Sequence, residues 1–182
     1  MNKKIIIGVL AALLLIACGV AWWRATAVPS YPVLMAAGER VSSWDFTGAY
    51  TGNAELEAKA RSEIERFTQM IGKGEFTDYI LYVSIANEYN LLGDGKNELK
   101  YLRYALAIDS QSTGLAWNNA GALFVRLGAL KTARMAYERA VAAQPTAQYR
   151  TALIDFLKEH YPEDLAAIRA AEEATGGAEL PQ

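Results

Sequence analysis

The sequence is poor in the side chains on which most catalytic and metal sites depend. Its 182 residues contain one cysteine, Cys18, and one histidine, His160, and they include no glycine-rich phosphate-binding loop. A single cysteine cannot form an intramolecular disulfide, and no stretch of the chain has metal-ligand spacing. These absences predict a protein that is not an enzyme, that needs no metal or cofactor, and that has no small-molecule substrate.

Positive charge is also scarce. The chain has 18 Lys and Arg residues against 20 Asp and Glu residues, and its formal net charge is -2. Three of the cations, Lys3, Lys4 and Arg24, flank an apolar run, so residues 25–182 hold 15 basic and 20 acidic side chains. An acidic domain with no basic stripe is not expected to bind nucleic acid.

The apolar run covers residues 5–23 and carries no charge. As a helix its 19 residues would extend about 28 Å, close to the roughly 30 Å hydrocarbon core of a bilayer. Trp22 and Trp23 at its end suit the membrane interface, and the two lysines before it make the N-terminal flank the more positive one. Residues 1–24 are therefore predicted to be a single-pass membrane anchor, with the C-terminal domain on the periplasmic or outer face.

A second interpretation of the same residues stays open. Leu15-Ile16-Ala17-Cys18 resembles the lipobox of bacterial lipoproteins, in which the cysteine is acylated and becomes the first residue of the mature chain. Against it, residues 19–23 remain apolar, whereas mature lipoproteins usually turn polar after the cysteine. Both interpretations place the domain at a membrane, outside the cytoplasm.

Residues 25–52 contain prolines and glycines without helical periodicity, which predicts a tether between the anchor and the domain. Several of its side chains are too apolar for a solvated coil, so they either pack on the domain or dock on a neighbouring membrane protein: Tyr31, Leu34, Met35, Trp44, Phe46 and Tyr50. From Asn53 onward, apolar residues recur every three or four positions, as in an amphipathic helix.

Two segments repeat at an offset of 35 residues. The second reads Trp117-x2-Ala120-Gly121-x2-Phe124, Ala133-x3-Tyr137, Ala140 and Pro145, and the first reads Tyr82-x2-Ile85-Ala86-x2-Tyr89, Leu102 and Ala105. Gly93 and Gly128, also 35 apart, would end the first helix of each segment. Glu98 departs from the pattern, because it stands where the second segment has Ala133, and a carboxylate at a close helix contact needs a partner.

This spacing resembles the tetratricopeptide repeat (TPR) family, whose signature is W-x2-L-G-x2-Y, A-x3-F and a late proline. The resemblance implies an all-α fold: a TPR-like solenoid of helical hairpins with two clear repeats and a degenerate capping repeat at 148–175. Together with the anchor, it divides the chain into residues 1–24, the tether at 25–52, a helical domain at 53–175 and a flexible tail at 176–182.

In that family the first helices of the hairpins line a groove that binds other proteins. Position by position, the resemblance implies a partner-binding groove formed by Val83, Asn87, Asn90, Asn118, Ala122, Val125 and Arg126, and Ile80 also stands at one of its lining positions. Asparagine amides both donate and accept hydrogen bonds, so they can hold a peptide backbone.

The resulting prediction is a membrane-anchored scaffold or assembly factor for a cell-envelope complex, with a protein partner. Two alternatives remain: an accessory structural subunit of a membrane complex, and a lipoprotein of the pilotin type acylated at Cys18.

Overall fold

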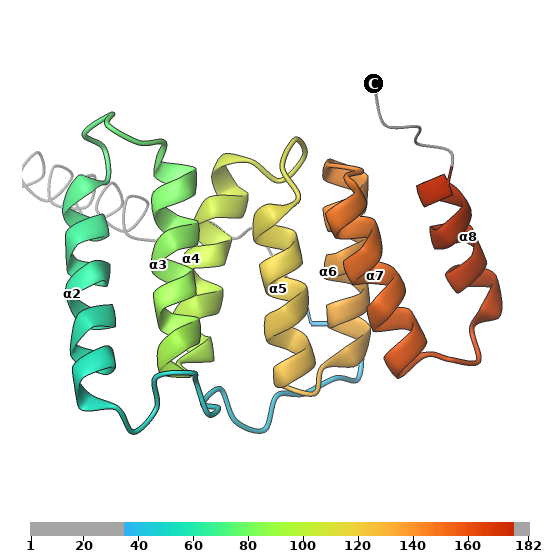
Figure 1. Ribbon diagram of the computed structural model, residues 1–182, viewed down its shortest axis with the longest axis horizontal. Helices are drawn as coiled ribbons and strands as arrows, with labels where there is room; N and C mark the ends of the chain where they lie inside the picture. The colour runs from blue at the N-terminus through green and yellow to red at the C-terminus, as the bar shows by residue number, and fades with distance from the viewer. Residues whose placement is uncertain (1–34, 177–182) are drawn as a thin grey trace, which may run out of the picture. The chain divides into compact units, whose positions relative to one another are not determined.

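The computed structural model describes residues 35–176, and this part of the chain contains seven α-helices and no strand (Figure 1). The helices are α2 (Ala54–Met70), α3 (Asp78–Leu92), α4 (Gly95–Ile108), α5 (Leu115–Arg126), α6 (Leu130–Ala143), α7 (Ala147–His160) and α8 (Leu165–Gly176). The all-α prediction is therefore confirmed for these residues. None of these helices is long and apolar enough to cross a membrane. The anchor predicted at 1–24, with Cys18, and nearly all of the predicted tail lie outside the described range.

Local sequence signals start and end several of the helices. The side chains of Asn53, Thr77, Asp94 and Thr146 accept hydrogen bonds from backbone N–H groups in the first turns of α2, α3, α4 and α7. Gly93 and Gly128 follow α3 and α5 with φ of +78° and +72°, the left-handed conformation that glycine adopts without strain.

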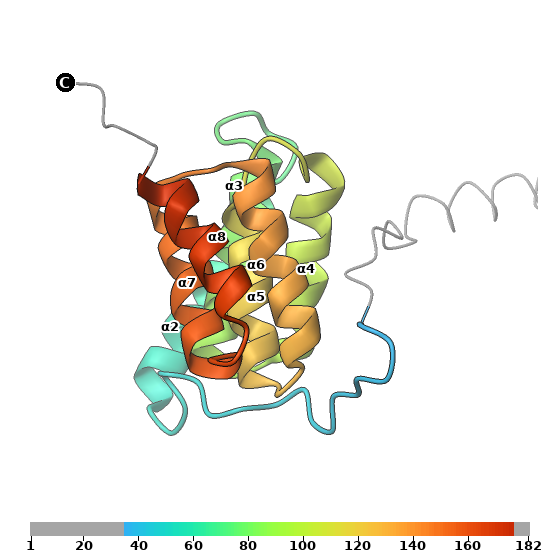
Figure 2. The same cartoon turned by 90° about the vertical axis from the view of Figure 1, so that its right-hand side faces the viewer.

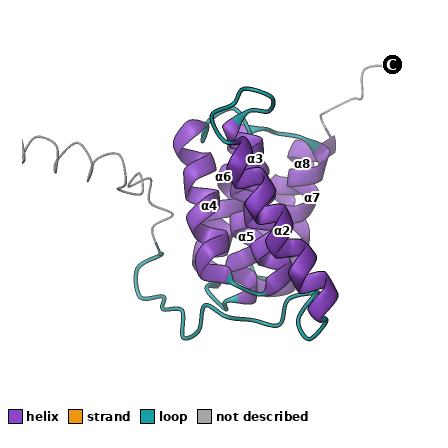
Figure 3. Cartoon of the chain, turned by 90° about the vertical axis from the view of Figure 1, so that its left-hand side faces the viewer, coloured by secondary structure: helices purple, strands orange, loops and turns teal. Residues whose placement is uncertain are grey.

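The helices pack as a row of hairpins. Helix α3 packs on α4, α5 on α6 and α7 on α8, while α4–α5 and α6–α7 contacts join successive hairpins and α2 covers α3. Gly121 is the small residue predicted at the contact between α5 and α6. A Cβ atom at this position would lie 2.9 Å from the ring of Tyr137 on α6, so a larger side chain does not fit. Figures 2 and 3 are viewed along the row. They show α4 and α6 along one side of it, and α5 and α7 along the opposite side.

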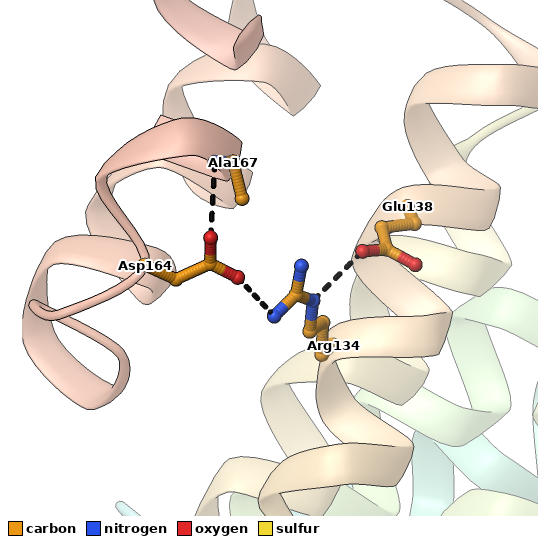
Figure 4. Close-up of polar contacts among 4 residues, drawn as sticks. All are labelled: Arg134, Glu138, Asp164 and Ala167. Carbon is orange, nitrogen blue, oxygen red and sulfur yellow. Dashed lines mark hydrogen bonds and ion pairs between the residues drawn. The ribbon is translucent and has the colours of Figure 1, made fainter. Parts of the chain in front are cut away.

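A polar contact joins the last two hairpins (Figure 4). Arg134 on α6 donates from Nη1 to Asp164 Oδ2 at 2.9 Å and from Nε to Glu138 Oε1 at 2.8 Å. The other oxygen of Asp164 accepts from the backbone N–H of Ala167, so the same carboxylate caps α8. These groups are partly exposed to solvent, so the contact orients α8 more than it stabilises the fold.

Residues 35–53, here called the N-terminal segment, run across the ends of the first two hairpins (Figure 1). The backbone N–H groups of Phe46 and Tyr50 donate to the carbonyl oxygens of Gly93 and Leu91 at 3.0 and 2.9 Å, and Gly95 donates to Trp44 at 2.9 Å. Four of its side chains pack against the core: Met35, Val41, Trp44 and Phe46. Of the apolar residues for which the sequence left two destinations open, Met35, Trp44 and Phe46 therefore lie on the domain's own surface.

Glu39 of this segment supplies the N-terminal cap that α6 lacks locally, since Ala129 has no polar side chain. Its carboxylate accepts from the backbone N–H groups of Lys131 and Thr132 at 2.7 and 2.8 Å, and from the Thr132 hydroxyl at 2.6 Å. Burial alone would raise the pKa of Glu39, but these hydrogen bonds outweigh burial and lower it below its ordinary value. The segment is thus held at both hairpins by specific polar contacts.

Candidate functional site

The predicted groove residues come from α3 and α5. Figures 1 and 3 place these helices, with α7, on the side of the row away from α4 and α6. Ala122 and Val125 are half-buried there, and Ile80 is 43% exposed at the first turns of α3. Val83, in contrast, is only 3% exposed and belongs to the core, so it offers almost no surface to a partner.

Asparagine side chains connect α3 with α5 on this side. Asn87 Oδ1 accepts a hydrogen bond at 2.9 Å from Nδ2 of Asn119. Asn119 is not one of the groove residues predicted from the repeat pattern. The neighbouring Asn118 is one of the predicted groove residues. Its side chain is half-buried, and its buried Oδ1 has no hydrogen-bond partner within residues 35–176. A repeat pattern read at fixed positions cannot choose between adjacent asparagines, because the choice depends on how far α5 is rotated against α3.

Asn90 faces the interior of the first hairpin. Its Nδ2 lies 3.0 Å from both carboxylate oxygens of Glu98, the residue that departs from the repeat pattern. Glu98 is 2% exposed, and burial raises its pKa to about 7, against smaller opposing effects of the Asn90 amide and the Arg126 charge. The partner that Glu98 was expected to need is therefore a neutral amide, and Asn90 is already engaged inside the domain.

Arg126 ends α5 with an exposed side chain. Its guanidinium lies 5.4 Å from the ring centre of Phe46 in the N-terminal segment, a cation–π contact. No ion pair of Arg126 occurs among the described residues. The side chain therefore presents a positive charge near the end of α5, and no carboxylate of residues 35–176 lies within ion-pair distance of it.

The seven candidate residues do not form one continuous polar cluster. The structure joins Asn87 to Asn119, Asn90 to Glu98 and Arg126 to Phe46, and each of these partners lies outside the seven. The Arg126 cation and the exposed parts of Ile80, Ala122 and Val125 remain accessible on α3 and α5, while the unpartnered oxygen of Asn118 is buried.

The described residues contain no group of three His, Cys, Asp or Glu side chains that could hold a metal ion. His160 lies at the end of α7 with its ring centre 5.1 Å from that of Phe156. In comparisons with known proteins, no family model matches the chain and no curated protein matches it.

Proposed function

We propose that the helical domain binds an extended or helical segment of another protein on the face formed by α3, α5 and α7. The exposed Arg126 cation, which makes no ion pair within residues 35–176, carries this proposal. Asn118 adds a second reason, because its buried Oδ1 has no hydrogen bond, which costs on the order of 1–3 kcal/mol. A segment that binds here and displaces the side chains over this oxygen would satisfy it with a backbone N–H. The nearby pair of Asn87 and Asn119 adds further amide groups for a peptide backbone.

The remaining surface of the face supports a peptide over a small polar ligand. Exposed and half-buried apolar side chains lie on α3 and α5, and Arg126 adds one cation at the end of α5. Such a mixture suits a segment with apolar side chains and an acidic group. The TPR-like interpretation draws support from the 35-residue offset, since Gly93 and Gly128 both take the left-handed conformation and Gly121 lies against Tyr137.

We expect the double variant Asn118→Ala/Arg126→Gln to lose the protein that co-purifies with the full-length chain in mild detergent. The first substitution removes the free acceptor and the second removes the cation. Loss of one good hydrogen bond and one charge contact corresponds to an affinity decrease of about tenfold or more. Quantitative mass spectrometry of partners recovered with tagged wild-type and variant chains measures this effect.

The matched control is Lys96→Ala/Met135→Ala, which truncates exposed side chains on α4 and α6. It should retain the same partner at the wild-type ratio, and both double variants should keep the wild-type helical circular dichroism spectrum, so that a lost partner does not reflect an unfolded domain. Equal recovery with both variants would rule out the α3–α5–α7 face as the binding site.

The proposal includes a location: a membrane-held scaffold or assembly factor for a cell-envelope complex, attached through residues 1–24. Two lysines are followed there by an uncharged apolar run that ends in two tryptophans, and this order is typical of an uncleaved membrane anchor. We expect the intact mass of the mature protein to equal that of the complete chain. A mass lacking residues 1–17 and increased by acyl chains would instead assign a lipoprotein held by Cys18 and would favour a pilotin-type role.

A further inference from the structure

Glu98 lies one helical turn after Gly95, and its partner Asn90 directly precedes Leu91; the N-terminal segment hydrogen-bonds the backbone of Leu91, Gly93 and Gly95 between them. Gly95 and Glu98 are three residues apart, so they occupy the same face of the helix. At Gly95, a Cβ atom would lie 2.7 Å from the carbonyl oxygen of Trp44 and 3.2 Å from the ring of Phe46. The segment therefore lies one helical turn from Glu98.

The groups around Glu98 stabilise its ionised carboxylate only weakly. Helix α3 contributes the Asn90 amide and α5 contributes the Arg126 charge. The N-terminal segment places the Phe46 ring and the Trp44 carbonyl oxygen beside Gly95, one turn away. Arg126 is exposed and makes no ion pair with Glu98. A carboxylate in such a place gains more from contact with water than from its present neighbours.

We propose that the N-terminal segment is a proton-dependent cover: it stays docked on the α3–α4 turn while Glu98 is neutral and lifts when Glu98 ionises. Lifting residues 41–53 breaks three backbone hydrogen bonds and admits water to the carboxylate. It also separates Phe46 from Arg126, so the guanidinium becomes free to turn toward Glu98 or toward a bound segment. The inference concerns this chain alone and does not require the partner proposed above.

The test is amide hydrogen exchange of the full-length chain in mild detergent, followed residue by residue by NMR between pH 5.5 and 8.5. After correction for base-catalysed chemical exchange, we expect the Phe46, Tyr50 and Gly95 amides to exchange about tenfold faster at the higher pH. A tenfold change corresponds to a difference of one unit in the pKa of Glu98 between docked and lifted states. In Glu98→Gln the same amides should stay slow across the range.

The amide of Leu123, a fully buried residue inside α5, reports more extensive unfolding and should not change. Arg126→Gln should move the midpoint of the response to higher pH, because Arg126 favours the ionised form of Glu98. The proposal is overturned if the wild-type amides show no pH response, if Glu98→Gln shows the same response, or if Arg126→Gln leaves the midpoint unchanged. Because no partner takes part, these outcomes are independent of the binding test.

Discussion

Gly93→Ala should destabilise the domain far more than Gly128→Ala, although the two glycines occupy the same position in successive hairpins. Both have positive φ, +78° and +72°, so alanine meets about 1–2 kcal/mol of backbone strain at either site. At Gly128 nothing lies within 4 Å of an added Cβ. At Gly93 the Cβ would collide with the carbonyl oxygen of Phe46 and lie 2.8 Å from the nitrogen of Gly48.

The collision at Gly93 involves backbone atoms, so no side-chain rotation can relieve it. The N-terminal segment must withdraw, with the hydrogen bonds made by Phe46, Tyr50 and Gly95 lost. At about 1 kcal/mol for each bond, Gly93→Ala should cost about 3 kcal/mol more than Gly128→Ala. Chemical denaturation of the full-length chain in mild detergent, followed by helical circular dichroism, gives both free energies of unfolding.

Gly48→Ala provides an independent check from the other side of the contact. Gly48 does not need a positive φ, but its Cβ would collide with the carbonyl oxygen of Leu91 and the nitrogen of Gly93. It should therefore resemble Gly93→Ala rather than Gly128→Ala. Equal losses at Gly93 and Gly128 would mean that the segment does not rest on the α3–α4 turn.

Glu98→Gln should stabilise the domain at pH 8 and remove much of its pH dependence between pH 4.5 and 8. Burial raises the pKa of Glu98 from 4.5 to about 7, so the folded state holds a proton that the unfolded state releases. The stability linked to this proton is fully present below about pH 4.5 and is lost as the pH rises through about 7. The pKa difference corresponds to an upper value on the order of 3 kcal/mol.

Glutamine keeps the shape of the neutral acid and can hydrogen-bond with Asn90, without the cost of a buried charge. We expect a gain of about 1–3 kcal/mol at pH 8 and little change at pH 4.5, measured by urea denaturation at each pH. Glu75→Gln, in the exposed loop before α3, is the matched control and should behave as wild type. A gain of the same size at both ends of the pH range would show that Glu98 does not titrate between them.

Several parts of this fold were predictable from residues close together in the chain. The hydrophobic spacing predicted helices, the offset between Gly93 and Gly128 predicted two equivalent helix ends, and Gly121 predicted a close helix contact. Glu98 stood out because it occupies the position that Ala133 holds in the second segment, and the structure gives it Asn90 as a partner. Each of these signals depends on helical periodicity or on one turn, so a short stretch of sequence contains it.

Other features depend on residues that only the tertiary structure brings together. Glu39 caps α6 across 93 positions of sequence, the N-terminal segment covers the α3–α4 turn, and Asn119 rather than Asn118 meets Asn87. Val83 fits the groove positions of the repeat and is nevertheless buried.

The amino-acid sequence by itself thus determined the helices and their repeat, because hydrogen bonds and apolar contacts within a helix involve residues three or four apart. The tertiary structure decided which polar groups are capped, buried or left free. Those outcomes depend on the distance and rotation between elements far apart in the chain, and the free energy of a polar group changes by several kcal/mol with its access to water.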